Sequence, residues 1–123
     1  MREHGYEPLR DVILSENGLV PSVVLVEFSR VAMRRGVQDE TVQRFFQQLW
    51  RNGHAVEAFT PEMGERAQLA NRRFGIGNGN RGLLNLLDLM VYATAQTLDL
   101  PILCTGRDYA STDAKIHPAS RPE

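Results

Sequence analysis

Residues 85–113 read NLLDLMVYATAQTLDLPILCTGRDYASTD, and this segment holds two apolar stretches and four aspartates, among them Asp88, Asp108 and Asp113. The first apolar stretch, 86–98, has the length of a helix, and the shorter second stretch is typical of a strand. Asp88 stands where the helix begins, and Asp108 and Asp113 follow the strand. Carboxylates are costly to place beside apolar surface unless they are paired, and a hard divalent cation is one such partner. The segment therefore predicts a metal-dependent site.

The rest of the sequence alternates helical and strand patterns. Ser22 and Thr60 are predicted helix caps, because a side-chain oxygen at this position accepts a hydrogen bond from a free backbone amide, and Gly36 is a predicted helix end. The predicted strands cover 18–21, 55–59 and 102–105, and the predicted helices cover 8–16, 22–35, 39 onward, 61–74 and 86–98. This alternation predicts an α/β domain around a parallel sheet, with functional sites at the carboxyl ends of its strands.

Length and charge limit the possible protein classes. A chain of 123 residues is long enough for one hydrophobic core, so we expect a single domain over 1–123. With 42% hydrophobic and 24% charged residues and a formal net charge of −1, the chain has an ordinary globular composition without a general basic field. Of its 14 basic residues 13 are arginine, which suits bidentate contacts with phosphate or carboxylate.

The apolar pattern and the lone cysteine indicate in which cellular compartment the protein is expected. Cys104 excludes an internal disulfide, and its apolar neighbours favour a buried thiol in a reducing cytoplasm. The sequence shows neither a signal-peptide pattern nor an apolar run long enough to cross a bilayer. We therefore expect a cytoplasmic protein without a membrane segment.

Each acid also has a purely structural interpretation. Asp88 follows Asn85 by three residues, so the two can form a capping box, and the sequence is equally compatible with a metal role. Glu27 precedes Arg30 by three residues, which favours a surface ion pair when Glu27 is considered alone. The two later aspartates lie in sequence typical of loops. The metal hypothesis requires these acids to converge at one edge of the sheet.

The glycine-rich segment 75–82, GIGNGNRG, suggests a competing site. Dinucleotide fingerprints follow a strand and open a helix, whereas this segment follows a helix and lacks the lysine of a P-loop. The pattern favours a flexible connection from which Arg81 can reach an anionic ligand. A small-molecule nucleotide binder that uses this loop is a further hypothesis.

Three segments in order carry a family resemblance: 20–27 (VPSVVLVE), 85–93 (NLLDLMVYA) and 106–113 (GRDYASTD). The chain resembles the PIN-domain toxin ribonucleases of type II toxin–antitoxin pairs, the VapC family, over nearly its whole length. The resemblance implies a three-layer α/β/α fold with a central parallel sheet. It also implies an endoribonuclease that uses Mg²⁺ or Mn²⁺, cleaves RNA, forms a homodimer and is inhibited by a cognate antitoxin.

The resemblance assigns roles to four acids. Glu27, Asp88 and Asp108 match acids of the family site and are the implied catalytic residues and metal ligands. Asp113 matches a further aspartate beside that site and is the implied fourth ligand. Carboxylates can hold a cation that activates water and offsets charge on a phosphate during phosphodiester cleavage, so the residue types suit this chemistry.

One part of the family pattern has no counterpart here. Family members begin with an apolar strand that ends in an acid, before a helix similar to the segment from Gly5 to Leu9, whereas Met1 lies inside or just before that helix. The resemblance thus implies a fold without its first strand and first metal-binding aspartate, either because the true start lies upstream or because the chain is a truncated remnant. We expect weak or absent nuclease activity, and the alternative is a non-catalytic protein that binds an antitoxin.

Overall fold

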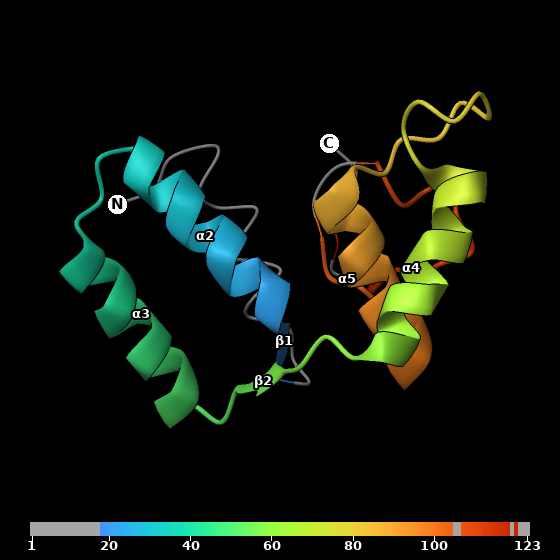
Figure 1. Ribbon diagram of the computed structural model, residues 1–123. Coiled ribbons are helices and arrows are strands. Elements are labelled where there is room, and N and C mark those ends of the chain that lie inside the picture. Colours follow the sequence, from blue (N-terminus) through green and yellow to red (C-terminus); the bar gives the residue numbers. More distant parts are fainter. Residues whose placement is uncertain (1–17, 105–106, 119, 121–123) are drawn as a thin grey trace. The chain divides into compact units, whose positions relative to one another are not determined.

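The computed structural model describes residues 18–104, 107–118 and 120. These residues form two compact units, the first ending at Ala58 and the second beginning at Phe59 (Figure 1). The helix predicted over 8–16 and the end of the strand predicted over 102–105 lie outside the described residues.

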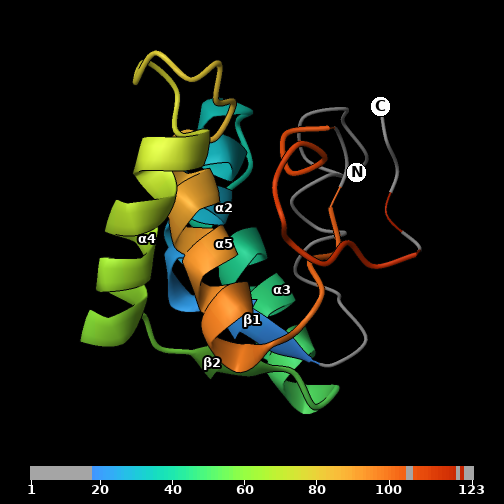
Figure 2. The same ribbon diagram turned by 90° about the vertical axis from the view of Figure 1, so that its right-hand side faces the viewer.

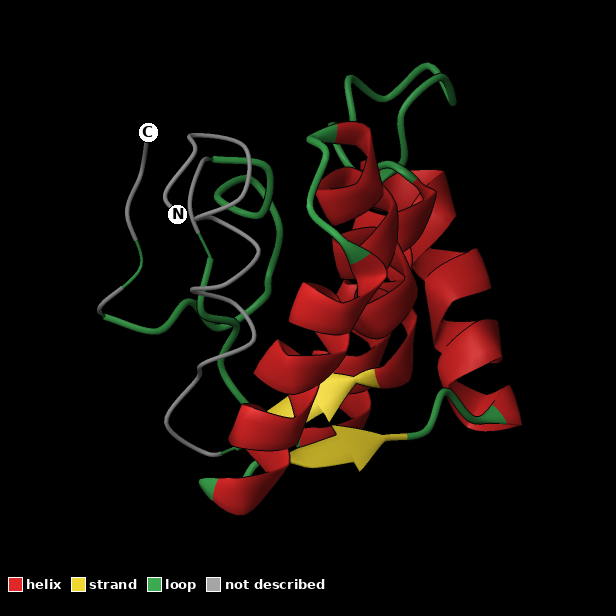
Figure 3. Ribbon diagram, turned by 90° about the vertical axis from the view of Figure 1, so that its left-hand side faces the viewer, coloured by secondary structure: helices red, strands yellow, loops and turns green. Residues whose placement is uncertain are grey.

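The described residues of the first unit, 18–58, form two short parallel strands and two helices. Val20 of one strand is in register with Val56 of the other, and the two strands lie side by side in Figure 3. The four elements in chain order are β1 (Leu19–Pro21), α2 (Ser22–Arg34), α3 (Asp39–Arg51) and β2 (Ala55–Glu57). A parallel pair needs a long crossover between its strands, which the two helices provide. Helices that alternate with parallel strands confirm the predicted α/β class.

Aromatic side chains hold α2 and α3 together. The Phe28 ring is stacked on Phe45 with 5.1 Å between the ring centroids and is tilted against Phe46 at 5.5 Å. Phe28 and Leu49 are almost completely buried. Buried Val42, Phe46 and Leu49 mark the part of α3 that faces the core.

The ends of these helices follow the sequence signals with one exception. Gly36 adopts a positive φ of 79° just after α2, a conformation that costs glycine little, so the predicted helix end is confirmed. The predicted cap at Ser22 is wrong, because Ser22 is the first helical residue and Pro21 occupies the cap position without a side-chain hydrogen bond.

The second unit contains α4 (Pro61–Phe74) and α5 (Leu86–Leu98), which pack side by side (Figures 1 and 2). Thr60 caps α4 as predicted, since its hydroxyl accepts a hydrogen bond from the Met63 amide at 3.2 Å. The rings of Phe74 and Tyr92 meet at 5.6 Å between the two helices. Both side chains are buried, so this contact is part of the apolar core of the unit.

The glycine-rich segment folds back on the end of α4. Side-chain amides of Asn78 and Asn80 donate hydrogen bonds to the carbonyls of Asn71 and Arg72, the latter at 2.5 Å. Both carbonyls belong to the last turn of α4, where backbone partners run out, and the Asn71 carbonyl also accepts from the Gly75 amide at 3.0 Å. The loop thus contributes to the C-terminal cap of the helix. Gly82 passes so close to the Phe74 backbone that a Cβ atom would collide with it.

The strand predicted over 102–105 is wrong for its described residues. Ile102 makes an isolated parallel bridge with Ile116, and its amide donates to the Lys115 carbonyl at 2.8 Å. The Cys104 amide donates instead to the Ser120 hydroxyl at 3.0 Å. A side chain thus satisfies the backbone donor that a neighbouring strand would otherwise satisfy. None of the helices formed by described residues is long and apolar enough to cross a membrane.

Candidate active site

Asp88 stabilises the start of α5. Its amide donates to Asn85 Oδ1 at 2.8 Å, and its carboxylate Oδ2 accepts from the Asn85 amide at 3.0 Å. This reciprocal pair is the capping box that the spacing of the two residues suggested. The cap fixes the carboxylate at the helix N-terminus, where the helix dipole favours a negative charge.

Tyr109 connects Asp88 with Asp108. Its hydroxyl donates to the Asp88 carbonyl at 3.2 Å, and its ring is buried although Asp108 beside it is exposed. Burial raises the pKa of the Tyr109 hydroxyl, and the charges of Asp88 and Asp108 raise it further. The charges of both predicted site residues thus act on the same buried tyrosine, and its hydrogen bond ties the turn that carries Asp108 to the start of α5.

The charges of Asp88 and Asp108 also act on the thiol of Cys104. Burial raises its pKa above the ordinary value, and the carboxylates of Asp108 and Asp88 add to this effect. A thiol in such surroundings stays protonated and is a poor nucleophile. The prediction that Cys104 is a buried packing residue is confirmed.

Asp113 is held by side chains of both α4 and α5. The Tyr92 hydroxyl donates to its Oδ1, and the Gln96 amide donates to the same oxygen at 3.4 Å. Arg73 Nη1 lies 3.8 Å from its other oxygen. The Asp113 carboxylate therefore anchors the loop that carries Asp108 to the two helices.

This anchoring changes the acidity of Tyr92. Burial raises the pKa of its hydroxyl to about 12, and the hydrogen bond to the Asp113 carboxylate and its negative charge act in the same direction. The positive charges of Arg73 and Arg66 act against this shift. The hydroxyl thus remains a donor at neutral pH.

Glu27 belongs to the first unit, on α2. Its carboxylate lies 4.0 Å from Arg30 Nη1, and its side chain is 30% exposed, so the predicted ion pair is confirmed. Pairing with an arginine does not exclude a metal role, because an exposed pair of this kind is weak.

The donor chemistry of the second unit suits a hard cation. Mg²⁺ is commonly held by one or two carboxylates while it keeps several water molecules, and Asp88 and Asp108 supply two. Among the described residues, no group of three histidine, cysteine, aspartate or glutamate side chains is close enough to enclose a metal ion. A site with two protein carboxylates and further ligands from water fits both observations.

Sequence reasoning did not assign roles to Tyr109 or Tyr92, and it did not pair Arg73 with Asp113. Tyr92 follows Asp88 by four residues, one helical turn, so spacing could have placed both on one side of α5. Tyr109 is the immediate neighbour of Asp108. For Arg73 no local signal exists, because its partner Asp113 lies 40 residues later in the sequence.

Comparison with known proteins identifies the family of this chain. Residues 2–115 match the PIN domain family. Ribonuclease VapC42 of Mycobacterium tuberculosis is 32% identical over 119 residues, which cover 95% of this chain and 88% of that protein. Ribonuclease VapC36 of the same organism is 43% identical over 64 residues, which cover 52% of this chain.

Coverage differs between these relatives. The matched segment spans 45% of VapC36, less than half of its length, and the same holds for a VapC ribonuclease of Mycobacterium bovis. The match to VapC42 and the PIN domain match both extend over almost the whole chain. The predicted PIN-like fold class is therefore confirmed, and the chain belongs to the VapC family of PIN-domain proteins.

Proposed function

We propose that this protein is a metal-dependent endoribonuclease, the toxin of a type II toxin–antitoxin pair. The observation that carries the proposal is the position of Asp88 and Asp108 around buried Tyr109, one at the start of a capped helix and the other on an exposed turn. Relatives named ribonucleases support the reaction type.

The metal ion is proposed to be Mg²⁺ or Mn²⁺, held by Asp88 and Asp108 of the second unit with water as the remaining ligands. Glu27 is a further ligand candidate on the family resemblance alone. When bound, such an ion supplies an activated water and offsets negative charge on the phosphate. Asp88 is suited to this role because its capping box limits its rotamers, and a ligand that is already ordered loses less entropy on binding.

The remaining polar groups are proposed to position these ligands. Tyr109 holds the Asp108 turn against the start of α5 through its bond to the Asp88 carbonyl. Asp113 supports the site by anchoring the same loop to Tyr92 and Arg73. Ligands with such outer support keep their geometry when the cation enters.

Cleavage of a labelled RNA by the full chain, with Mg²⁺, Mn²⁺ or EDTA, tests the proposal. We expect cleavage that requires the metal. Asp88→Asn should lower the rate by roughly 100-fold, because loss of even an outer-sphere partner costs 10–100-fold. The amide oxygen of asparagine can still accept the Asn85 bond and preserve the helix cap.

Asp99→Asn is the matched control. Asp99 lies at the other end of α5, pairs with Lys115 at 2.6 Å and has a φ of 56°, which asparagine adopts readily. This variant should cleave as the unaltered chain does. Cleavage in EDTA, equal rates for both variants, or no cleavage under any metal condition would refute the proposal.

The proposed partners are an RNA substrate, a cognate antitoxin and a second copy of the chain in a homodimer. The proposed compartment is the cytoplasm, which suits the free thiol of Cys104. Capture of an antitoxin by a folded chain that never cleaves RNA would instead favour the non-catalytic binding protein considered above.

A further inference from the structure

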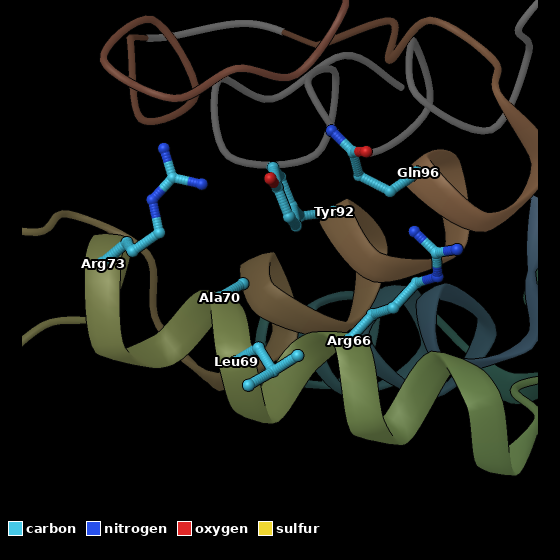
Figure 4. Close-up of a pocket in the computed structure, with 6 residues that line it drawn as sticks. All are labelled: Arg66, Leu69, Ala70, Arg73, Tyr92 and Gln96. Carbon is cyan, nitrogen blue, oxygen red and sulfur yellow. The ribbon is translucent and has the colours of Figure 1, made fainter.

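A small hollow lies between α4 and α5 beside the Asp113 anchor. Its volume is about 160 Å³, and it is open to solvent (Figure 4). Its lining consists of Arg66, Leu69, Ala70, Arg73, Tyr92 and Gln96. The bottom is formed by short or apolar side chains of α4, whereas polar groups stand around the rim. Such a shape can accept a compact polar group.

Two arginines stand on either side of Tyr92 in this hollow (Figure 4). Arg66 and Arg73 are seven residues apart, about two helical turns, so they project from the same side of α4. Both side chains are substantially exposed, by 45% and 66%. Their guanidinium groups therefore remain accessible to a ligand.

The guanidinium group of Arg73 is oriented by the ring of Phe74. Its guanidinium carbon lies 4.6 Å from the centroid of the Phe74 ring, a favourable cation–π distance. The Phe74 ring in turn packs against Tyr92. An arginine that is ordered before binding loses less rotamer entropy when it contacts a ligand.

The positive charges of both arginines act on the Tyr92 hydroxyl, where they oppose the raised pKa. The guanidinium groups of Arg66 and Arg73, one on each side of Tyr92, thus both act on its hydroxyl (Figure 4). Gln96 adds an amide to the same rim. The Tyr92 hydroxyl and the Gln96 amide donate to Asp113, so the donors that an added anion can reach are the two guanidinium groups.

Two acids compete with such an anion. Glu62 pairs with Arg66 at 3.3 Å, and Asp113 approaches Arg73 at 3.8 Å. Both pairs are exposed to solvent, where ion pairs are weak and screened. A phosphate diester, which accepts paired donors from arginine, can therefore displace or share these contacts.

We propose that this hollow binds a phosphate group of the RNA backbone and so positions the strand beside the Asp108 loop. The inference rests on the proposed ribonuclease function. It deepens that function by assigning substrate contact to Arg66 and Arg73. The contact is with backbone phosphate and is therefore independent of base sequence.

The test is binding of a fluorescein-labelled single-stranded RNA to the full chain in EDTA, measured by anisotropy at several salt concentrations. Arg66→Gln with Arg73→Gln should weaken binding at least tenfold. The slope of log Kd against log salt should fall by about 1.4, which is about 0.7 for each lost phosphate contact. Arg72→Gln removes one charge from α4 outside the hollow and is the matched control for each single variant, with a change in Kd below about threefold.

Circular dichroism verifies the fold of each variant. If the double variant does not fold, the inference is tested with the two single variants. Each of them should lower the slope of log Kd against log salt by about 0.7. Effects no larger than that of Arg72→Gln, or no RNA binding by the unaltered chain, would overturn the inference. Loss of antitoxin binding with unchanged RNA binding would also overturn it and assign the hollow to a protein carboxylate.

The outcome separates this inference from the proposed function. If RNA binding depends on the two arginines but the unaltered chain never cleaves RNA, the hollow keeps its role and the ribonuclease proposal fails. If Mg²⁺-dependent cleavage occurs and neither arginine affects RNA binding, only the inference fails.

Discussion

Two tyrosine hydroxyls hold Asp88 and Asp113 of the second unit in place. Tyr109 donates to the Asp88 carbonyl, and Tyr92 donates to the Asp113 carboxylate. Both rings are buried, so each hydroxyl needs a partner inside the protein. Tyr109 donates to a backbone carbonyl and therefore leaves the charge of the Asp88 carboxylate available to a cation. The Asp113 carboxylate has Gln96 and Arg73 as further partners, which suits an anchoring role.

The raised pKa of Tyr92 predicts a loss of stability at high pH. Its pKa in the folded protein is about 12, against 10 for an unperturbed tyrosine, because of burial and then the contact with Asp113. Below pH 10 both the folded and the unfolded chain hold the proton, so the stabilisation is complete. Between pH 10 and 12 the unfolded chain releases it first, so folding stability should fall by roughly 1–2 kcal/mol from this group.

Urea unfolding at several pH values between 9 and 12 measures this effect. Tyr92→Phe should show a smaller fall over the same range, because the variant has no hydroxyl to titrate at this position. Other groups titrate in both proteins and cancel in the difference between them. A pH dependence identical in both proteins would contradict the prediction.

At the level of elements, local sequence signals placed the helices well. The bounds predicted for the last helix, 86–98, are those of α5, because Asn85 and Asp88 form a cap that the spacing reveals. The strand predicted at 102–104 is wrong, because an apolar run of this length also occurs in buried segments that belong to no strand. Its Cys104 amide is satisfied by Ser120, a side chain 16 residues away.

Two glycines of the second unit should respond in opposite ways to alanine. Gly64 lies within α4, where a Cβ would meet only Phe59 at 3.9 Å, so Gly64→Ala should stabilise the protein by about 0.5–1 kcal/mol through helix propensity. Gly82→Ala should destabilise it by roughly 1–3 kcal/mol, because the new methyl group would overlap the Phe74 backbone and force it to move.

Thermal or urea unfolding of both variants measures the two changes, and each variant serves as the control for the other. Destabilisation by Gly64→Ala would contradict the open space described near the start of α4, and an unchanged stability of Gly82→Ala would contradict the described packing of the glycine-rich loop at its end. The comparison thus tests how the glycine-rich loop closes on the helix.

At the scale of the whole molecule, binding of the proposed cation should stabilise the fold. A ligand that binds the folded chain alone adds about 1.4 kcal/mol at ten times its Kd. For a chain of this size that corresponds to a rise in Tm of roughly 3–6 °C. Mg²⁺ or Mn²⁺ should therefore raise Tm relative to EDTA, and Asp99→Asn should show the same rise.

Asp88→Asn should abolish most of this shift, because it removes a charged ligand while it leaves the helix cap in place. The measurement does not depend on RNA cleavage, so it tests the metal site separately from the reaction. An equal rise of Tm in Asp88→Asn would contradict the assignment of Asp88 as a ligand.

The sequence by itself determined the elements of this protein and its family. Helix caps, apolar spacing and the motif segments are properties of residues close together in the chain, and these local signals are enough to identify a PIN-type α/β protein. The acids of the candidate site were also visible at this level. Their roles as ligands remain predictions.

Only the tertiary structure decided which groups surround those acids. Asp113 meets Arg73 and Tyr92, which precede it by 40 and 21 residues, and these side chains come together only when α4 and α5 pack. The hollow lined by Arg66 and Arg73 arises from the same packing. Long-range contacts of this kind leave no periodic pattern in the sequence, because each depends on the folded position of elements that are far apart in the chain.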